Sequence, residues 1–470
     1  MFSYMKRGKG FYKDLFSLAL PMMIQNLIMT GLAMVDIFMV GLLGEAPMAA
    51  VTLANTPIFV IQLLVFGVQS GSAVLISQFW GKQDRDSINR VMGIAFCFTG
   101  AVSTIFALIT FLIPQHFMSL FSDNALLVGI SAKYIRIAGA SYIFNSLVGV
   151  YVGAHRSMEN PKLGLMIFGC SMLINTFLNW VLIFGKLGAP AMGVEGAALA
   201  TLLARVAELI LMLVYESCNR RFRMNLSLAF SPNRAMLKKF LRYSTPVVLN
   251  ETLWGLGTSI FPTIMGHMEN STEILAAYTI AGNIEKLCTV AIFALAGTAA
   301  VIIGREIGKG RMDESYEVGA TLCATSVMLG LGIGCIMLLL LYMFIEPVVY
   351  PLFGLSPLAC RFATVMQTVT YIFLAPRAFN STAIVGVLRG GGDVRAATVI
   401  DITPLWLVAI PLTALCGLVL KTDIVWVCLS MVSENLVKFG LGIWRFRSRK
   451  WINDITQAAT DNTETAHEPL

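Results

Sequence analysis

The run from Leu15 to Leu43, LFSLALPMMIQNLIMTGLAMVDIFMVGLL, constrains this chain more than any other stretch. About 20 apolar residues suffice to cross a bilayer as a helix, and this run is longer. Its one charged residue is Asp36. A carboxylate inside a membrane span rarely faces lipid, so we predict that Asp36 is a functional group facing a cavity. The alternative is a structural counter-ion for a buried Lys or Arg.

The polar groups of this span share one face. Gln25, Met29, Leu32 and Asp36 recur at helical spacing, which places them on one stripe. Pro21 also lies inside the span, where its missing N–H and its ring favour a kink. We therefore predict a hinge at Pro21.

Composition predicts a polytopic helical membrane protein. Of the residues, 57% are hydrophobic and only 13% are charged, and the mean hydropathy is +0.75. A soluble protein with so little charge would not cover its surface. Nine scattered Cys and four His form no metal or catalytic constellation, so neither an enzyme nor a cofactor is predicted. The net charge of +7 comes from loop Lys and Arg and implies no nucleic acid.

Hydropathy predicts an all-α fold of twelve transmembrane helices. A basic linker and the internal repeat described below divide them into two halves of six, which the family resemblance given below implies are two six-helix lobes. The predicted spans are 15–43, 47–76, 88–113, 125–153, 162–185, 193–216, 236–266, 273–304, 315–345, 358–388, 395–418 and 422–445. The predicted regions are an amino-terminal segment (1–14), an N-lobe (15–216), a basic linker (217–235), a C-lobe (236–445) and a disordered tail (446–470).

The placement of Lys and Arg predicts the orientation in the membrane. They gather at the amino terminus, in the even-numbered connections and after the last span, whereas the opposite loops hold only Lys186, Arg361 and Lys421. Basic loops stay in the cytoplasm. Both termini and the linker are therefore predicted to be cytoplasmic, in a multi-pass protein of the plasma membrane.

The chain also repeats itself. Leu20-Pro21 aligns with Thr245-Pro246, and Gly81-Lys82 aligns with Gly308-Lys309. Because each half holds an even number of predicted spans, both halves enter from the same side. The halves are therefore predicted to be parallel repeats related by a pseudo-two-fold axis along the membrane normal.

Four motifs resemble one transporter family. They are VDIFMVGLLG (Val35 to Gly44), SQFWGKQD (Ser77 to Asp84), MGVEGAALAT (Met192 to Thr201) and LRGGGD (Leu388 to Asp393). In this order, along twelve predicted spans, they resemble the multidrug and toxic compound extrusion (MATE) transporters. The resemblance implies two lobes forming a V, a central cavity, and drug efflux coupled to inward Na⁺ or H⁺.

Helical rise predicts that four oxygen-bearing side chains meet in the outer half of the first lobe. Asp36 and Asn179 each lie roughly 9 Å from the outer end of their spans, and Thr201 roughly 12 Å. Asn175 lies one turn deeper than Asn179. Such oxygens suit a cation, or a carboxylate that exchanges a proton. Ordinary hydrogen bonding between helices is the alternative for Asn175 and Thr201.

The resemblance to MATE transporters implies which residue types belong at these four positions. MATE proteins with a first-lobe site carry Asp, Asn, Asp and Thr at the positions matching Asp36, Asn175, Asn179 and Thr201. Asn179 therefore replaces a carboxylate. One carboxylate fewer weakens the attraction for Na⁺ and makes proton coupling at Asp36 more plausible, and the ion stays open between Na⁺ and H⁺.

The second lobe has acids of its own. Glu251 lies near the midplane of its span, and Glu285 lies at similar depth beside Asn283 and Lys286. Their depth makes Glu251, Asn283 and Glu285 candidates for coupling or substrate binding. The resemblance adds that Glu251 matches a cation-site acid of another MATE branch, whose tenth-span acid has no counterpart in this chain. The alternative is a buried pair of Glu251 or Glu285 with Lys286.

Other intramembrane charges are predicted to be structural. Asp401 and Arg377 lie at comparable height, which favours a structural ion pair between them. Two further pairs are predicted within single helices, Arg205 with Glu208 and Glu434 with Lys438.

These features predict a secondary antiporter that exports organic, often cationic, drugs or toxins in exchange for Na⁺ or H⁺ by alternating access. Its predicted partners are a small organic substrate, the coupling ion and the lipid bilayer, and it is predicted to act as a monomer. The first alternative is a flippase for a lipid-linked oligosaccharide or another lipid-like substrate. Such flippases often have extra spans or an Arg-rich cavity that holds phosphates, and the few intramembrane cations of this chain argue against this alternative. The second is a receptor or scaffold without transport.

Overall fold

The computed structural model describes residues 7–219, 221–231 and 233–456, and these residues form helices and loops with no named strand. In lipid, every backbone N–H and C=O must be bonded within the protein, and a helix does this within each segment. The long apolar stretches are accordingly helical. The predicted all-α membrane fold is confirmed.

The described first half contains helices α1 (Lys9–Gly41), α2 (Glu45–Gly81), α3 (Arg85–Leu112), α4 (Pro114–Ser119), α5 (Ala125–Ser157), α6 (Lys162–Phe184), α7 (Gly193–Cys218) and α8 (Leu226–Ala229). The described second half contains α9 (Arg234–Gly266), α10 (Ser271–Gly308), α11 (Met312–Leu340), η2 (Leu341–Val349), α12 (Tyr350–Leu352), α13 (Pro357–Ile372), α14 (Leu374–Asn380), η3 (Ser381–Leu388), α15 (Val394–Pro404), η4 (Leu405–Ala409), α16 (Ile410–Ala414), η5 (Leu415–Val419) and α17 (Ile424–Arg447), where η marks π-helical turns.

The number of membrane spans is ten or eleven by length and apolarity within the described chain. Ten helical stretches qualify, and an eleventh is counted when α13 and the segment 374–388, bent by 52° to one another, are taken as one span. Helix α9 has 33 residues but is not among them, because polar and basic side chains interrupt its apolar residues. The predicted count of twelve therefore stays a prediction.

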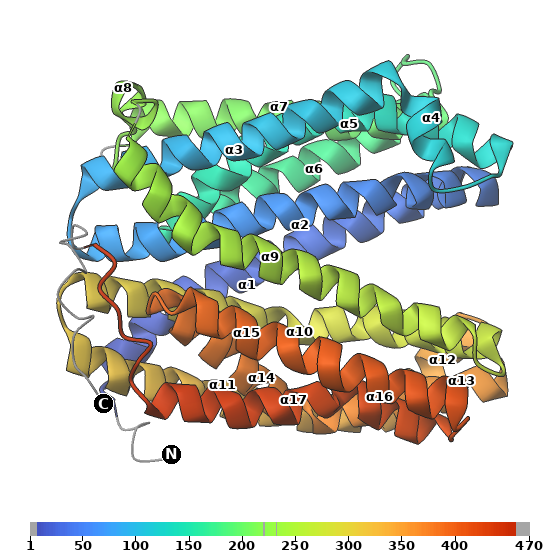
Figure 1. Ribbon diagram of the computed structural model, residues 1–470. Helices are drawn as coiled ribbons and strands as arrows, with labels where there is room; N and C mark the ends of the chain where they lie inside the picture. Colours follow the sequence, from blue (N-terminus) through green and yellow to red (C-terminus); the bar gives the residue numbers. More distant parts are fainter. Residues whose placement is uncertain (1–6, 220, 232, 457–470) are drawn as a thin grey trace.

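The helices form two groups (Figure 1). Helices α2 to α7 make one group and α9 to α17 the other, and the groups approach each other at the end where α1 begins and α17 ends. Helix α1 belongs to both. Leu15 and Leu18 pack into the core of the second group, while the helix also runs along α6. Pro21 is buried within this continuous helix, and its role as a hinge stays a prediction.

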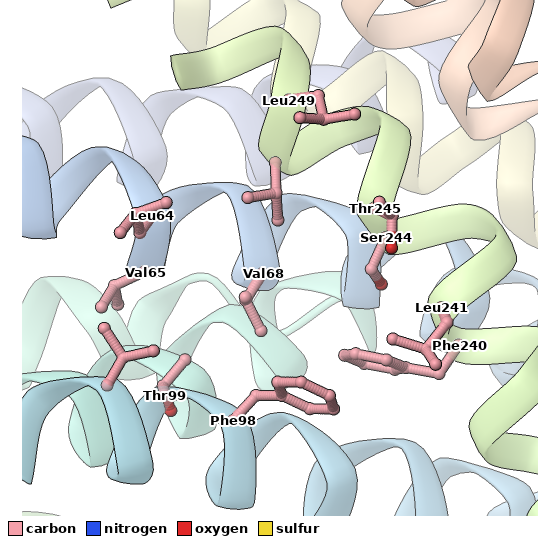
Figure 2. A pocket seen from close by; sticks show the side chains of 12 residues that line it. Leu64, Val65, Val68, Phe98, Thr99, Phe240, Leu241, Ser244, Thr245 and Leu249 are labelled. Carbon is pink, nitrogen blue, oxygen red and sulfur yellow. The ribbon is translucent and has the colours of Figure 1, made fainter. Parts of the chain in front are cut away.

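Small residues let the two groups meet closely. A Cβ added at Gly71 of α2 would lie 2.6 Å from the Cα of Ser244 in α9, and one added at Gly67 would lie 2.7 Å from the Cα of Val248. Small residues at such crossings allow backbones to touch. Beside this crossing lies an apolar pocket between α2, α3 and α9 (Figure 2).

Residues paired by the internal repeat meet face to face at the same end. A Cβ on Gly81 of α2 would lie 2.2 Å from the carbonyl oxygen of Arg305 and 3.0 Å from the Cα of Gly308. Gly308, the repeat partner of Gly81, approaches the carbonyl oxygen of Gln78 in turn. This mutual contact between equivalent turns is what a two-fold axis passing between α2 and α10 would produce.

Gly304→Leu is expected to destabilise the protein by about 1–3 kcal/mol, the usual cost of overpacking. Gly304 is buried, and even its added Cβ would lie 2.0 Å from Oγ of Ser77. The measurement is the midpoint of thermal unfolding in detergent. Gly332→Leu is the matched control, because a Cβ at Gly332 meets nothing within 4 Å. Equal midpoints for the two variants would contradict the close contact of α2 with α10.

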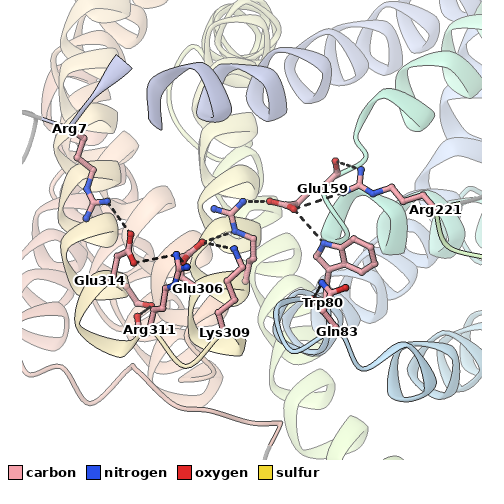
Figure 3. Close-up of polar contacts among 11 residues, drawn as sticks. Arg7, Trp80, Gln83, Glu159, Arg221, Glu306, Lys309, Arg311 and Glu314 are labelled. Carbon is pink, nitrogen blue, oxygen red and sulfur yellow. Dashed lines mark hydrogen bonds and ion pairs between the residues drawn. The ribbon is translucent and has the colours of Figure 1, made fainter. Parts of the chain in front are cut away.

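Ion pairs also join the two groups at this end (Figure 3). Glu159, which follows α5, pairs with Arg305 of α10 and accepts a hydrogen bond of 3.4 Å from the Trp80 indole. Arg305 also donates to Glu306 at 2.7 Å. Partly exposed ion pairs contribute little each. The network therefore adds little stability to the contact, and the glycine contacts provide the close packing.

The start of the predicted disordered tail is folded. Trp451 is fully buried, and Gln78 of α2 donates 3.1 Å hydrogen bonds to the carbonyl oxygens of Gly390 and Asn453. The N–H of Ile455 donates back to Gln78 at 3.0 Å. The prediction of disorder is wrong up to Thr456, because a buried indole and paired backbone groups hold this segment. Residues 457–470 lie outside the described part of the chain.

Candidate functional site

Four predicted residues of the first group form one hydrogen-bonded chain. The Asn179 amide donates to the Asp36 carboxylate at 2.6 Å and to the Asn175 amide oxygen at 2.9 Å. The Asn175 amide in turn donates to the Thr201 hydroxyl at 3.4 Å. The structure thus brings together side chains from α1, α6 and α7, as helical depth predicted. Their role in ion coupling stays a prediction.

Local sequence explains how these side chains meet. Asn175 and Asn179 are one helical turn apart and both buried on α6, so they share a face. Helix α7 comes close because Gly196 lies against α6, where an added Cβ would sit 2.6 Å from the carbonyl oxygen of Leu182. Thr201 donates to the carbonyl of Ala197 at 3.0 Å, which anchors its hydroxyl.

Charges around this chain leave one more acid than base. Arg205 pairs with the fully buried Glu208 at 2.6 Å, as its spacing predicted, and it also attracts Asp36. Tyr134 of α5 is buried and lies near Asp36 and Thr201. Tyr134 was missed by sequence reasoning, because tyrosines within spans are common and only the packing of α5 against α7 brings this one near.

The second group holds a longer chain of buried charges. Arg389 pairs with Glu251 at 2.7 Å and with Asp401 at 3.8 Å. Lys438 pairs with Asp401 at 2.9 Å and with Glu434 at 3.1 Å, the second of these pairs being predicted. Buried charges persist only when paired in this way. Two bases here face three acids, so this chain also carries one acid in excess.

The predicted Asp401–Arg377 ion pair is wrong. Arg377 of α14 pairs instead with Glu285 of α10, while Asp401 accepts a hydrogen bond from Asn250 at 2.9 Å and pairs with Lys438 and Arg389. Equal height in the membrane was the basis of the prediction, but the two side chains face different neighbouring helices.

The alternative pairing of an acid with Lys286 is also wrong. Glu251 and Glu285 each pair with an arginine, whereas Lys286 and Asn283 are exposed on α10. Glu251 and Glu285 therefore belong to separate ion pairs, and the structure does not bring Asn283 to either acid. Within the described residues, no group of three or more His, Cys, Asp or Glu is placed to hold a metal ion.

The sequence pattern of a known protein family matches most of the chain. This family, described as MatE, matches residues 21–181 and 246–415. The chain belongs to the MatE family. The two matched segments begin at Pro21 and Pro246, the prolines paired by the internal repeat. Members of the MatE family are transporters and not enzymes, as the sequence predicted.

Curated relatives and solved structures are similar along nearly their whole length. An uncharacterized transporter of Bacillus subtilis, YisQ, is 26% identical over 93% of this chain and 95% of its own. The probable multidrug resistance protein NorM of Thermotoga maritima is 23% identical over 93% of each chain. A mutant of the Vibrio cholerae MATE transporter VcmN superposes with a TM-score of 0.84 at 18% identity, covering 95% of this chain and 98% of its own. These likenesses show a MATE fold in a multi-pass membrane transporter.

Proposed function

We propose that this MatE transporter is a secondary antiporter that exports organic, often cationic, molecules in exchange for inward Na⁺ or H⁺. The observation that carries the proposal is the hydrogen-bonded chain from Asp36 through Asn179 and Asn175 to Thr201. In this chain the carboxylate accepts from one amide, which leads through a second amide to a hydroxyl. The four side chains come from three helices, so a charge able to attract an ion is linked to the packing of those helices.

Asp36 is the coupling group in this proposal. Asn179 Oδ1 is buried and has no hydrogen-bond partner among the described residues, so an oxygen near the carboxylate is free to accept from a proton-bearing group or to contact a cation. With one acid in excess nearby, binding of one positive charge neutralises the cluster. Neutralisation changes how α1 packs on α6 and α7. In this way, binding of the ion changes the conformation of the protein.

The contact between the two helix groups supplies the gate. The groups meet through α2, α9 and α10 at the end where α1 begins and α17 ends (Figure 1). With both termini in the cytoplasm of a plasma-membrane protein, as proposed from the basic loops, this contact closes the cytoplasmic side. Transport then requires that ion and substrate favour different states, since only differential affinity shifts an equilibrium.

The test is efflux of a fluorescent organic cation from vesicles that contain the purified protein, which we expect to act as a monomer. A Na⁺ gradient and a pH gradient are imposed separately, with protein-free vesicles as control. We expect the fluorescent cation to move under one of the two gradients, and the gradient that drives it identifies the coupling ion. Folded protein that moves the cation under neither gradient would contradict the antiporter and direct attention to lipid-like substrates.

A further inference from the structure

Helices α9 and α15 are neighbours in the structure (Figure 1). A groove lined by two arginines lies between them. Leu241, Leu249 and Val399 line its apolar part, and Arg242 and Arg395 line it as well. Arg395 stands in the first turn of α15 and Arg242 in the first third of α9. Both therefore belong to the end of the molecule where α1 begins and α17 ends, which we call the terminal side.

The two guanidinium groups are available to a ligand. Arg242 and Arg395 are exposed, and neither forms an ion pair within the described part of the chain. Asp393, the acid nearest to Arg395 in the sequence, is already paired with Arg445 at 2.6 Å. Arg242 lies over the ring of Tyr243 at 6.0 Å from its centroid. Two unpaired cations at the polar end of an apolar groove match an anion that carries a hydrophobic body.

A second apolar pocket lies on the other side of α9. It is enclosed by α2, α3 and α9 and lined by Val65, Val68 and Phe98 among others (Figure 2). Leu241, Thr245 and Leu249 line both this pocket and the arginine groove. These three residues are spaced four apart, so they form one ridge along α9 with an apolar hollow on each flank.

The dimensions of the ridge fit one leaflet. Leu241 and Leu249 are separated by about 12 Å of helix, and half of a bilayer hydrocarbon core is about 15 Å thick. The arginines lie at the end of the ridge that faces the terminal side, which is the level of a headgroup. An acyl chain starting there runs beside α9 toward the middle of the membrane.

We propose that this surface is a binding site for an anionic diacyl phospholipid of the leaflet on the terminal side. Its phosphate binds Arg242 and Arg395, and its two acyl chains lie in the two hollows flanking the ridge of α9. Because the pocket includes α2 and α3 of the first group while the groove includes α15 of the second, one bound lipid contacts both groups where they meet.

The experiment measures lipid binding to the full-length, delipidated protein in detergent by native mass spectrometry. The probes are dioleoyl phosphatidylglycerol and dioleoyl phosphatidylcholine, which differ in headgroup charge but share acyl chains. The test variant is Arg242→Gln with Arg395→Gln. The control is Arg85→Gln with Lys162→Gln, which removes the same charge from exposed residues outside the groove.

Preference for phosphatidylglycerol is expected in the parent protein and in the control. The test variant is expected to lose about fivefold in affinity for phosphatidylglycerol per arginine, or about 25-fold in all. Its binding of phosphatidylcholine is expected to fall less, because the choline group offsets the charge of that lipid's phosphate. Equal binding of the two lipids by the parent, or equal losses in test and control variants, would overturn the proposal. Displacement of the lipid by millimolar glycerol phosphate would also overturn it, because the site would then recognise an anion without chains.

Discussion

Replacing Asp36 by Asn is expected to abolish ion-driven efflux while the protein stays folded. Asn has nearly the same shape, and its amide oxygen accepts the 2.6 Å hydrogen bond that Asn179 donates to Asp36. It cannot ionise, so it neither takes up a proton nor attracts a cation. No side chain at this position then changes its charge when an ion or proton binds. Ion binding therefore no longer favours one transporter conformation over the other, and coupling is lost.

The measurement is efflux of the organic cation under the driving gradient, in vesicles with equal amounts of folded protein. Asn179→Asp is the informative companion, because it adds a second carboxylate at the position where related MATE proteins are expected to carry one. That variant is expected to depend more strongly on Na⁺, since a second negative charge raises the attraction for a cation. Undiminished gradient-driven efflux by the Asp36→Asn variant would remove Asp36 from the mechanism.

Lys438→Met is expected to lower the free energy of unfolding by about 3–5 kcal/mol, the usual effect of breaking a buried ion pair. The Lys438 side chain is 5% exposed and lies 2.9 Å from Asp401 and 3.1 Å from Glu434. Met keeps the length and packing of the side chain but leaves two acids without this cation. Burial of unpaired carboxylates is costly, so the loss comes from the acids that remain.

The measurement is the unfolding transition in mixed micelles, with Lys421→Met as control. Lys421 pairs with Glu269 at 2.9 Å, but both side chains are largely exposed, so no measurable loss is expected there. Asp401→Asn in the Lys438→Met background is expected to restore part of the stability, because it removes one of the orphaned charges. Equal stability of the Lys438→Met and Lys421→Met variants would show that the buried chain contributes little.

Much of the first-group site was predictable because it depends on spacing along helices. Asn175 and Asn179 are one turn apart, which places them on one face whatever the helix packs against. Depth then brings Asp36 and Thr201 to a similar level. The contacts between these side chains follow once α1, α6 and α7 are neighbours. Tyr134 escaped prediction, since no local pattern distinguishes it from other tyrosines in spans.

Partner choice in the second group was not predictable in the same way. Asp401 and Arg377 share a depth, yet Asp401 turns toward α9 and α17 and Arg377 toward α10. Depth along a helix gives one coordinate of a side chain. Its direction around the helix axis has meaning only when the neighbouring helices are known.

The all-α membrane fold, the internal repeat and the side chains able to carry charge can be predicted from the amino-acid sequence, because they depend on hydropathy and spacing within single segments. The pairing of charges, the docking of Trp451 and the following residues against Gln78 and the close approach at particular glycines are visible only in the packed structure. Each of these depends on contacts between segments that lie far apart in the chain, and such contacts exist only once the helices are packed.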